Sequence, residues 1–265
     1  MCNNLPKIIL LEISGMDTII ELIAEFRNRK KNDFVKKQVY YRAICYIVGL
    51  LILAMGLTLN TKAGLGVSPI ISVSYSTSEI FQLNFGNTTL ILYCIFVVVE
   101  LILHSVQKNT DPQQNRKLIL LMDILQIPLS LIFTRFLNLF GSFLPDFSSG
   151  ADSWDQHFPL RLLVLILAII CTGIGAAMSL SMRIVPNPGD GIVQAIADGI
   201  HKDVGFTKNC FDLLNITITI TLGLLLAGHL VGVGIGTVLA VIGVGRVIAL
   251  FQHFAGNKLT ALAGV

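Results

Sequence analysis

The stretch Val185-Pro186-Asn187-Pro188-Gly189-Asp190-Gly191-Ile192 interrupts a chain that is otherwise rich in apolar helical segments. Proline fixes its own φ angle and lacks a backbone donor, so two prolines end a helix that arrives from the N-terminal side. The break also puts a carboxylate, Asp190, next to two prolines and two glycines. An earlier stretch, Leu65-Gly66-Val67-Ser68-Pro69-Ile70, has the same character. We predict that these two breaks organise the fold.

The composition is that of a membrane protein. Of the 265 residues, 54% are hydrophobic and only 13% are charged, whereas soluble domains carry about a quarter charged residues. The net charge of +3 is small, and no nucleic-acid partner is expected. The five cysteines form no CxxC pair and lie mostly in apolar segments, so we expect no disulfide framework, metal or cofactor.

Six apolar runs are each long enough, at about 20 residues, to cross a bilayer. Lysine and arginine gather before the first run, between the second and third, between the fourth and fifth, and after the sixth. The positive-inside rule then predicts a multi-pass membrane protein with both termini cytoplasmic. The runs cover residues 40–59, 88–104, 118–140, 160–182, 210–227 and 237–254.

Residues 1–38 form an N-terminal cytoplasmic extension of different character. Ile19, Ile20, Ile23 and Phe26 have helical spacing and are followed by the basic run 27–31. One interpretation is an amphipathic helix on an anionic membrane surface. The other is a positively charged flank that fixes the orientation of the first span.

The two breaks belong to an internal repeat. Aligning Pro69 with Pro188 sets a displacement of 188 − 69 = 119 residues, which places Gly56 on Gly175 without a gap. Span one then matches span four, span two matches span five, and span three fits span six. Since three spans is an odd number, the second half must be inverted relative to the first. We therefore expect an all-α fold of two inverted three-helix repeats, residues 39–158 and 159–265.

Each break is followed by about 14 residues with one polar and one apolar helical face, roughly 21 Å if helical, which is too short and too polar to span a bilayer. Two interpretations remain. The segments are either broken, re-entrant helices that face a protein-lined cavity, or amphipathic helices that rest in the interface. A new helix start would also expose backbone N–H groups that attract an anion.

Polar residues of both segments and of the spans are candidates for a substrate site. Asp190 and Asp198 are candidates for proton coupling, although Asp190 could instead cap the helix that follows it. Arg246 lies deep in the sixth span and is expected to face the interior as a fixed positive charge. The predicted substrate-binding residues are Ser68, Pro69, Ser72, Gln126, Asn187, Pro188, Gly189, Asp190, Gln194 and Arg246.

Four motifs resemble those of the YczE/YitT-like family of bacterial integral membrane proteins, over about residues 40–255. They are the runs 61–73, 125–130, 188–191 and 236–238. The resemblance implies a multi-span inner-membrane protein, sometimes described as a transporter, with no agreed substrate. Asn138 and the run 232–235 depart from the charged residues common in that family.

The sequence favours a small-molecule or ion transporter with its site between the inverted repeats. The alternative is a non-transporting accessory or sensor subunit, which would have no cavity between the halves. No enzyme is expected, because no HExxH motif or nucleophile elbow is present. The expected partners are the lipid bilayer and an unknown small molecule or ion, and a homo-oligomer is an alternative because glycine pairs such as Gly243 and Gly245 could pack helices between chains.

Overall fold

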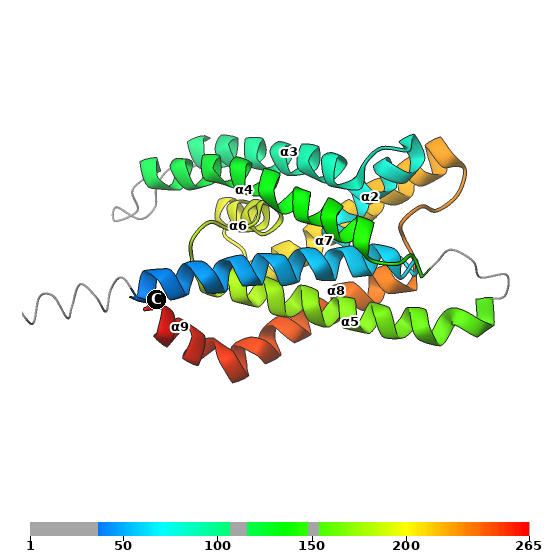
Figure 1. The fold of residues 1–265 in the computed structure, drawn as a ribbon. Helices are drawn as coiled ribbons and strands as arrows, with labels where there is room; N and C mark the ends of the chain where they lie inside the picture. The colour runs from blue at the N-terminus through cyan, green and yellow to red at the C-terminus, as the bar shows by residue number, and fades with distance from the viewer. Residues whose placement is uncertain (1–36, 107–115, 148–153, 265) are drawn as a thin grey trace, which may run out of the picture.

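The computed structural model describes residues 37–106, 116–147 and 154–264, and within these ranges it contains helices and no strand. The extension predicted at 1–38 lies almost wholly outside the described residues. The first helix is Lys37–Lys62. The others are α2 Pro69–Phe81, α3 Phe85–Val106, α4 Arg116–Phe143, α5 Trp154–Ser181, α6 Pro188–Ile200, α7 Val204–Leu222, the π-helix η1 Gly223–Ala227, α8 Ile235–Phe251, the π-helix η2 Gln252–Gly256 and α9 Asn257–Ala263 (Figure 1).

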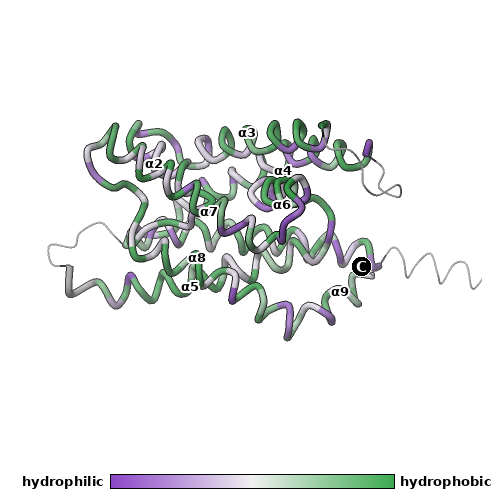
Figure 2. The backbone as a smooth tube through the Cα atoms, turned by 180° about the vertical axis from the view of Figure 1, so that it is seen from behind, coloured by the Kyte–Doolittle hydropathy of each residue, from purple (hydrophilic) through white to green (hydrophobic). Residues whose placement is uncertain are grey.

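Six helical segments are long and apolar enough to cross a membrane, as predicted. They are Lys37–Lys62, Phe85–Val106, Arg116–Phe143, Phe158–Ser181, Val204–Ala227 and Ile235–Ala263. Large apolar side chains such as Ile91, Leu163 and Leu213 are more than half exposed on them, and the long helices are mostly apolar along their length (Figure 2). An exposed apolar surface of this extent suits contact with lipid, so the all-α, multi-span fold class is confirmed.

The two short helices begin at the prolines of the two breaks and have the same form. Each is 13 residues long with Pro at its first position, and each ends in a left-handed residue, Gln82 in α2 and His201 in α6. α2 packs against α3 and α7, and α6 packs against the same two helices. Figure 1 shows α6 end on, so it runs across the long helices.

The first helix and α5 cross at two glycines. A Cβ built on Gly56 would lie 2.5 Å from the backbone nitrogen of Thr172, and a Cβ built on Gly175 would meet the backbone nitrogen of Leu53. Gly56 and Gly175 are 119 positions apart, and so are Leu53 and Thr172. The crossing is therefore reciprocal, and it allows the two backbones to approach closely.

Two arginines at the same displacement make a second reciprocal pair. Arg42, near the start of the first helix, donates to the carbonyls of Met182 and Arg183 at the end of α5. Arg161, near the start of α5, donates to the carbonyls of Ala63 and Gly64 at the end of the first helix. Each arginine satisfies carbonyl groups that a helix C-terminus leaves without intrahelical partners.

The third spans of the two halves pack differently. α4 lies along α3, whereas α8 lies along α5. Gly173 of α5 faces Val247, and Gly243 of α8 faces Ile169. The C-terminal Gly264 lies against Gln38, so the described part of the chain begins and ends at the same end of the bundle, as an even number of spans requires.

Candidate functional site

The N-termini of α2 and α6 meet inside the bundle. A Cβ on Gly189, in the first turn of α6, would lie 2.7 Å from Cγ1 of Ile70, in the first turn of α2. Pro69, Pro188 and Gly189 are all buried. The two post-break segments therefore touch at the first turn of each helix, which is its positive end.

On the α2 side the polar groups are paired. The backbone N–H of Ser68 donates to Oδ1 of Asn60 at 2.7 Å. The Ser72 hydroxyl donates to the Pro69 carbonyl and lies 2.8 Å from the hydroxyl of Thr219 on α7. Ser72 and Thr219 have no exposed surface, so this crossing of α2 and α7 is a closed, neutral network.

On the α6 side the helix cap is Asn187, whose side chain accepts from the N–H of Gly189. The interpretation of Asp190 as that cap is wrong, because Asp190 lies three residues further on, in the first turn. Burial raises the pKa of the Asp190 carboxyl, and nearby Lys208 opposes that rise. A carboxylate in a helix's first turn is favoured by the helix dipole, yet within the described ranges no ion pair involves Asp190.

The crossing of α6 with α3 differs from that of α2 with α7. A Cβ on Gly191 would lie 2.7 Å from Oε1 and 2.8 Å from Oε2 of Glu100, so the carboxylate lies directly on the α6 backbone. Nε2 of Gln126 on α4 donates to Oε2 of Glu100 at 2.6 Å. Glu100 is 1% exposed and Gln126 has no exposed surface. Glu100 Oε1 and Gln126 Oε1 both lack a hydrogen-bond partner.

Two ion pairs flank these crossings. His104 Nδ1 lies 2.7 Å from Oδ2 of Asp123, one turn from Glu100 towards the end of α3. Lys208 Nζ lies 3.3 Å from Oδ2 of Asp212 on α7. Both aspartates are about 95% buried, so each needs a positive partner or a proton to be stable at depth.

Glu100 is a residue that the sequence reasoning missed. It stands inside the second predicted span, and an ionisable residue within a span is by default a sign of function. That signal was present in the sequence. The glycine that receives Glu100 could not be inferred, because it lies on a helix from the other half.

The structure does not bring all predicted residues to this site. Gln194 and Asp198 are exposed and bond to each other, with Nε2 of Gln194 2.9 Å from Oδ1 of Asp198. The prediction that Arg246 faces the interior is wrong, because Arg246 is exposed. Gly243 and Val247 face α5 and turn Arg246 away from the core.

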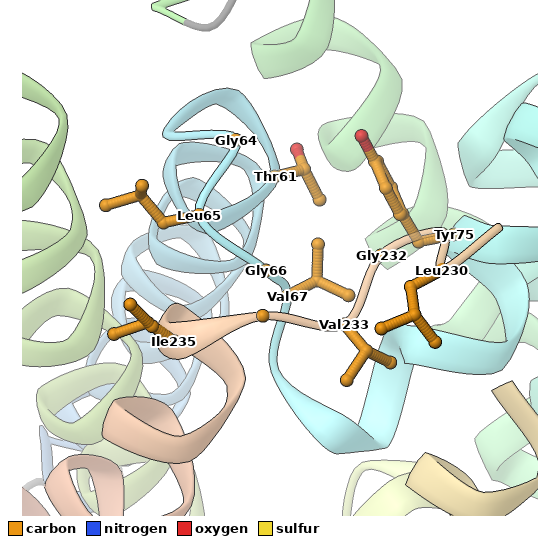
Figure 3. Close-up of a pocket in the computed structure, with 11 residues that line it drawn as sticks. Thr61, Gly64, Leu65, Gly66, Val67, Tyr75, Leu230, Gly232, Val233 and Ile235 are labelled. Atoms are coloured by element: carbon orange, nitrogen blue, oxygen red, sulfur yellow. The ribbon is translucent and has the colours of Figure 1, made fainter. Parts of the chain in front are cut away.

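A cavity of about 400 Å³ opens at one end of the bundle, between the segments 64–67 and 230–235 (Figure 3). Tyr75 of α2 and Thr61 line it, and burial raises the pKa of Tyr75 to about 12. The two segments are held by backbone bonds from Val67 to Gly232 and from Gly236 to Leu65.

A second cavity touches the Asn187 side of the site. Tyr93, Ser130 and Phe133 line it together with Asn187 and Pro188. It has no room for a water molecule. Neither cavity reaches both Ser68 and Asp190, so the described site is closed in this conformation.

Comparisons with known proteins give a family and no activity. Residues 40–253 match the Family of unknown function (DUF6198). The chain is 24% identical over 219 residues to the uncharacterized protein YyaS of Bacillus subtilis (strain 168), which covers 80% of this chain and 96% of that protein. No solved structure matches. The resemblance to the YczE/YitT-like family stays a prediction.

Proposed function

Because the chain belongs to the Family of unknown function (DUF6198), we propose its function from its own geometry: it is a secondary transporter of a small molecule or ion. The substrate site lies where the N-termini of α2 and α6 meet. The protein resides in the bacterial inner membrane with both termini cytoplasmic.

The observation that carries the proposal is the contact between Ile70 and Gly189 inside a bundle of six apolar helices. Broken helices whose N-termini meet near the middle of the membrane form the substrate sites of many secondary transporters. Around this contact lie the buried polar side chains of Ser72, Asn187 and Gln126. Polar groups at membrane depth cost free energy and persist where they serve a site.

Reciprocal contacts support an inverted repeat, the arrangement that allows one half to rock against the other. Gly56 lies against the backbone of α5, and Gly175 lies against the backbone of the first helix. Arg42 binds the end of α5, and Arg161 binds the end of the first helix. The axis that relates the halves would pass near Ile70 and Gly189, since these residues are displaced by the same 119 positions and touch.

The cavity beside Tyr75 is the proposed entrance from the non-cytoplasmic side. It ends at the backbone bonds between residues 65–67 and 232–236. Gly66, at φ +110°, and Gly234 permit this close approach, because a Cβ on Gly66 would lie 2.5 Å from the Gly234 nitrogen. Opening towards the site would require these two segments to separate.

The test begins with a thermal-shift screen of the purified full chain against metabolites, since a ligand that binds only the folded state raises its melting temperature. The best binder, radiolabelled, is then offered to proteoliposomes under a pH gradient. We expect gradient-driven uptake that Asp190→Asn abolishes while membrane insertion stays intact. Asp198→Asn, an exposed carboxylate on the same helix, is the matched control.

The alternative is a non-transporting accessory subunit, and the closed interior favours it. The cavity between residues 64–67 and 230–235 does not reach the contact of Ile70 and Gly189, and the cavity beside Asn187 has no room for a water molecule. It predicts that no metabolite raises the melting temperature and that no compound enters the proteoliposomes. Uptake that Asp190→Asn leaves unchanged would remove Asp190 from the mechanism.

A further inference from the structure

We propose that Glu100 of α3 and Gln126 of α4 form a proton-binding site that lies against α6, with Oε1 of Glu100 as the atom that takes the proton. The inference rests on the proposed transporter only for its role in coupling. It adds a proton-binding carboxylate in the second span to the coupling group proposed at Asp190.

The hydrogen-bond inventory of the pair lacks one donor. Glu100 Oε2 receives Nε2 of Gln126, while Glu100 Oε1 and Gln126 Oε1 are buried and unpaired. Two acceptors without a donor in a water-poor interior each carry an uncompensated desolvation penalty. A proton on Glu100 Oε1 converts that atom into a donor and offers the amide oxygen of Gln126 a partner.

A proton fits this site better than a metal cation. Hard cations need a shell of several oxygen ligands, and in the part of the chain that the structure describes only two oxygens here lack partners. Neither described cavity reaches the pair, so water cannot complete a shell from there. Proton addition needs no further ligand, breaks no bond, and raises the charge of the cluster by one.

The groups around Glu100 suit reversible protonation of its carboxylate. Asp123 on α4 and His104 on α3 are the charged groups that act on Glu100, and Asp198 on α6 acts in turn on His104. The facing surface of α6 at Gly191 has no side chain. The carboxylate therefore touches the short broken helix α6 directly. Its charge state acts on the element that would move in transport.

The site can be tested without knowing the substrate. The full chain is purified, placed in lipid bilayers and titrated with acid and base while its infrared spectrum is recorded. We expect a protonated-carboxyl stretching band that Glu100→Gln removes. Glu79→Gln, which changes an exposed carboxylate on α2, should leave the band in place.

A second variant leaves Glu100 itself intact. Gln126→Leu removes the donor to Oε2, so the same band should move to a higher frequency, a readout that a purely structural role would not produce. Replacing potassium with sodium at constant ionic strength should not change the band. Loss of the band in sodium would show a metal-cation site and overturn the proposal.

A wild-type spectrum identical to that of Glu100→Gln at every pH, with no effect of Gln126→Leu, would also overturn it. This outcome differs from failure of the proposed function. Without the band, metabolite uptake could still be present, and with the band, the liposomes could still take up nothing.

Discussion

The crossing of α3 with α6 and the crossing of α7 with α2 occupy matching places in the two halves but have opposite chemistry. Thr219 and Ser72 meet in one, 2.8 Å apart and fully paired. Glu100 and Gly191 meet in the other, with a carboxylate oxygen left unpaired. Thr219 stands 119 positions after Glu100, and Ser72 stands 119 before Gly191. A shared backbone arrangement thus supports one saturated crossing and one that can take a proton.

The difference extends to the third spans. α4 lies along α3 and brings Gln126 to the carboxylate. The matching position on α8 is Gly245, which has nothing within 4 Å of where its Cβ would be. Because α8 lies along α5 instead, the neutral crossing receives no third polar partner. Of these two crossings, only that of α3 with α6 therefore carries an ionisable group.

The largest effect is expected at the crossing of the first helix with α5. Gly175→Ala would force the α5 backbone away from that of the first helix at Leu53. Overpacking of this kind should destabilise the protein by about 3 kcal/mol, measured by unfolding in mixed micelles. Gly245→Ala, with open space at its Cβ, should instead gain up to about 1 kcal/mol. Equal effects of the two variants would contradict the packing account.

The second-largest effect is expected at the crossing of α3 with α6. Gly191→Ala places a methyl group against the Glu100 carboxylate and should cost about 2 kcal/mol, because the pair with Gln126 must shift. In a Glu100→Ala background the same change should cost almost nothing. The double-mutant cycle gives the coupling directly, and additive effects would show that Gly191 is needed for another reason.

The first turn of α6 should also respond to pH. Burial raises the pKa of Asp190 above its usual 3.8, so the folded state binds a proton that the unfolded state has lost. Stability from this group is therefore complete below about pH 4 and declines as pH rises towards the folded-state pKa. Asp190→Asn should flatten that decline and be more stable than wild type at neutral pH, as measured by thermal unfolding across pH. A variant with the wild-type pH profile would refute the assignment.

The smallest effect is expected at the neutral crossing. Ser72→Ala and Thr219→Ala each remove one buried hydroxyl pair. Hydrogen bonds between membrane helices average about 0.6 kcal/mol, and the double variant should cost little more than either single one. Neither variant should alter the infrared band assigned above to Glu100. A loss of stability larger than that of Gly191→Ala would show that the crossing of α2 with α7 contributes more to stability than the crossing of α3 with α6.

Much of the architecture follows from local rules. The prolines at 69 and 188 set the starts of α2 and α6, and apolar length identified all six spans. The 119-residue displacement also paired the two breaks with each other. These features depend on backbone chemistry and on segment length, which the sequence carries explicitly.

The site itself was only partly predictable. Gln126 and Asn187 were identified as polar residues in apolar surroundings, and both are buried at the crossings. Arg246 was misplaced because an orientation about a helix axis depends on which neighbour the helix packs against. α8 leaves the position that α4 takes in the first half, and the similarity of the two halves gave no warning of that change.

The exchanged arginines have a consequence for biosynthesis. Arg42 lies 140 residues before Met182, whose carbonyl it binds, and at synthesis rates of about 5–20 residues per second that partner emerges on the order of ten seconds later. The carbonyls of Ala63 and Gly64 likewise remain open until Arg161, 98 residues after Ala63, has been made. The first helix must therefore remain in the bilayer with unpaired carbonyls at its end until α5 has been made. A truncated nascent chain that stops before α5 should be recognised as incomplete by the quality-control proteases of the membrane.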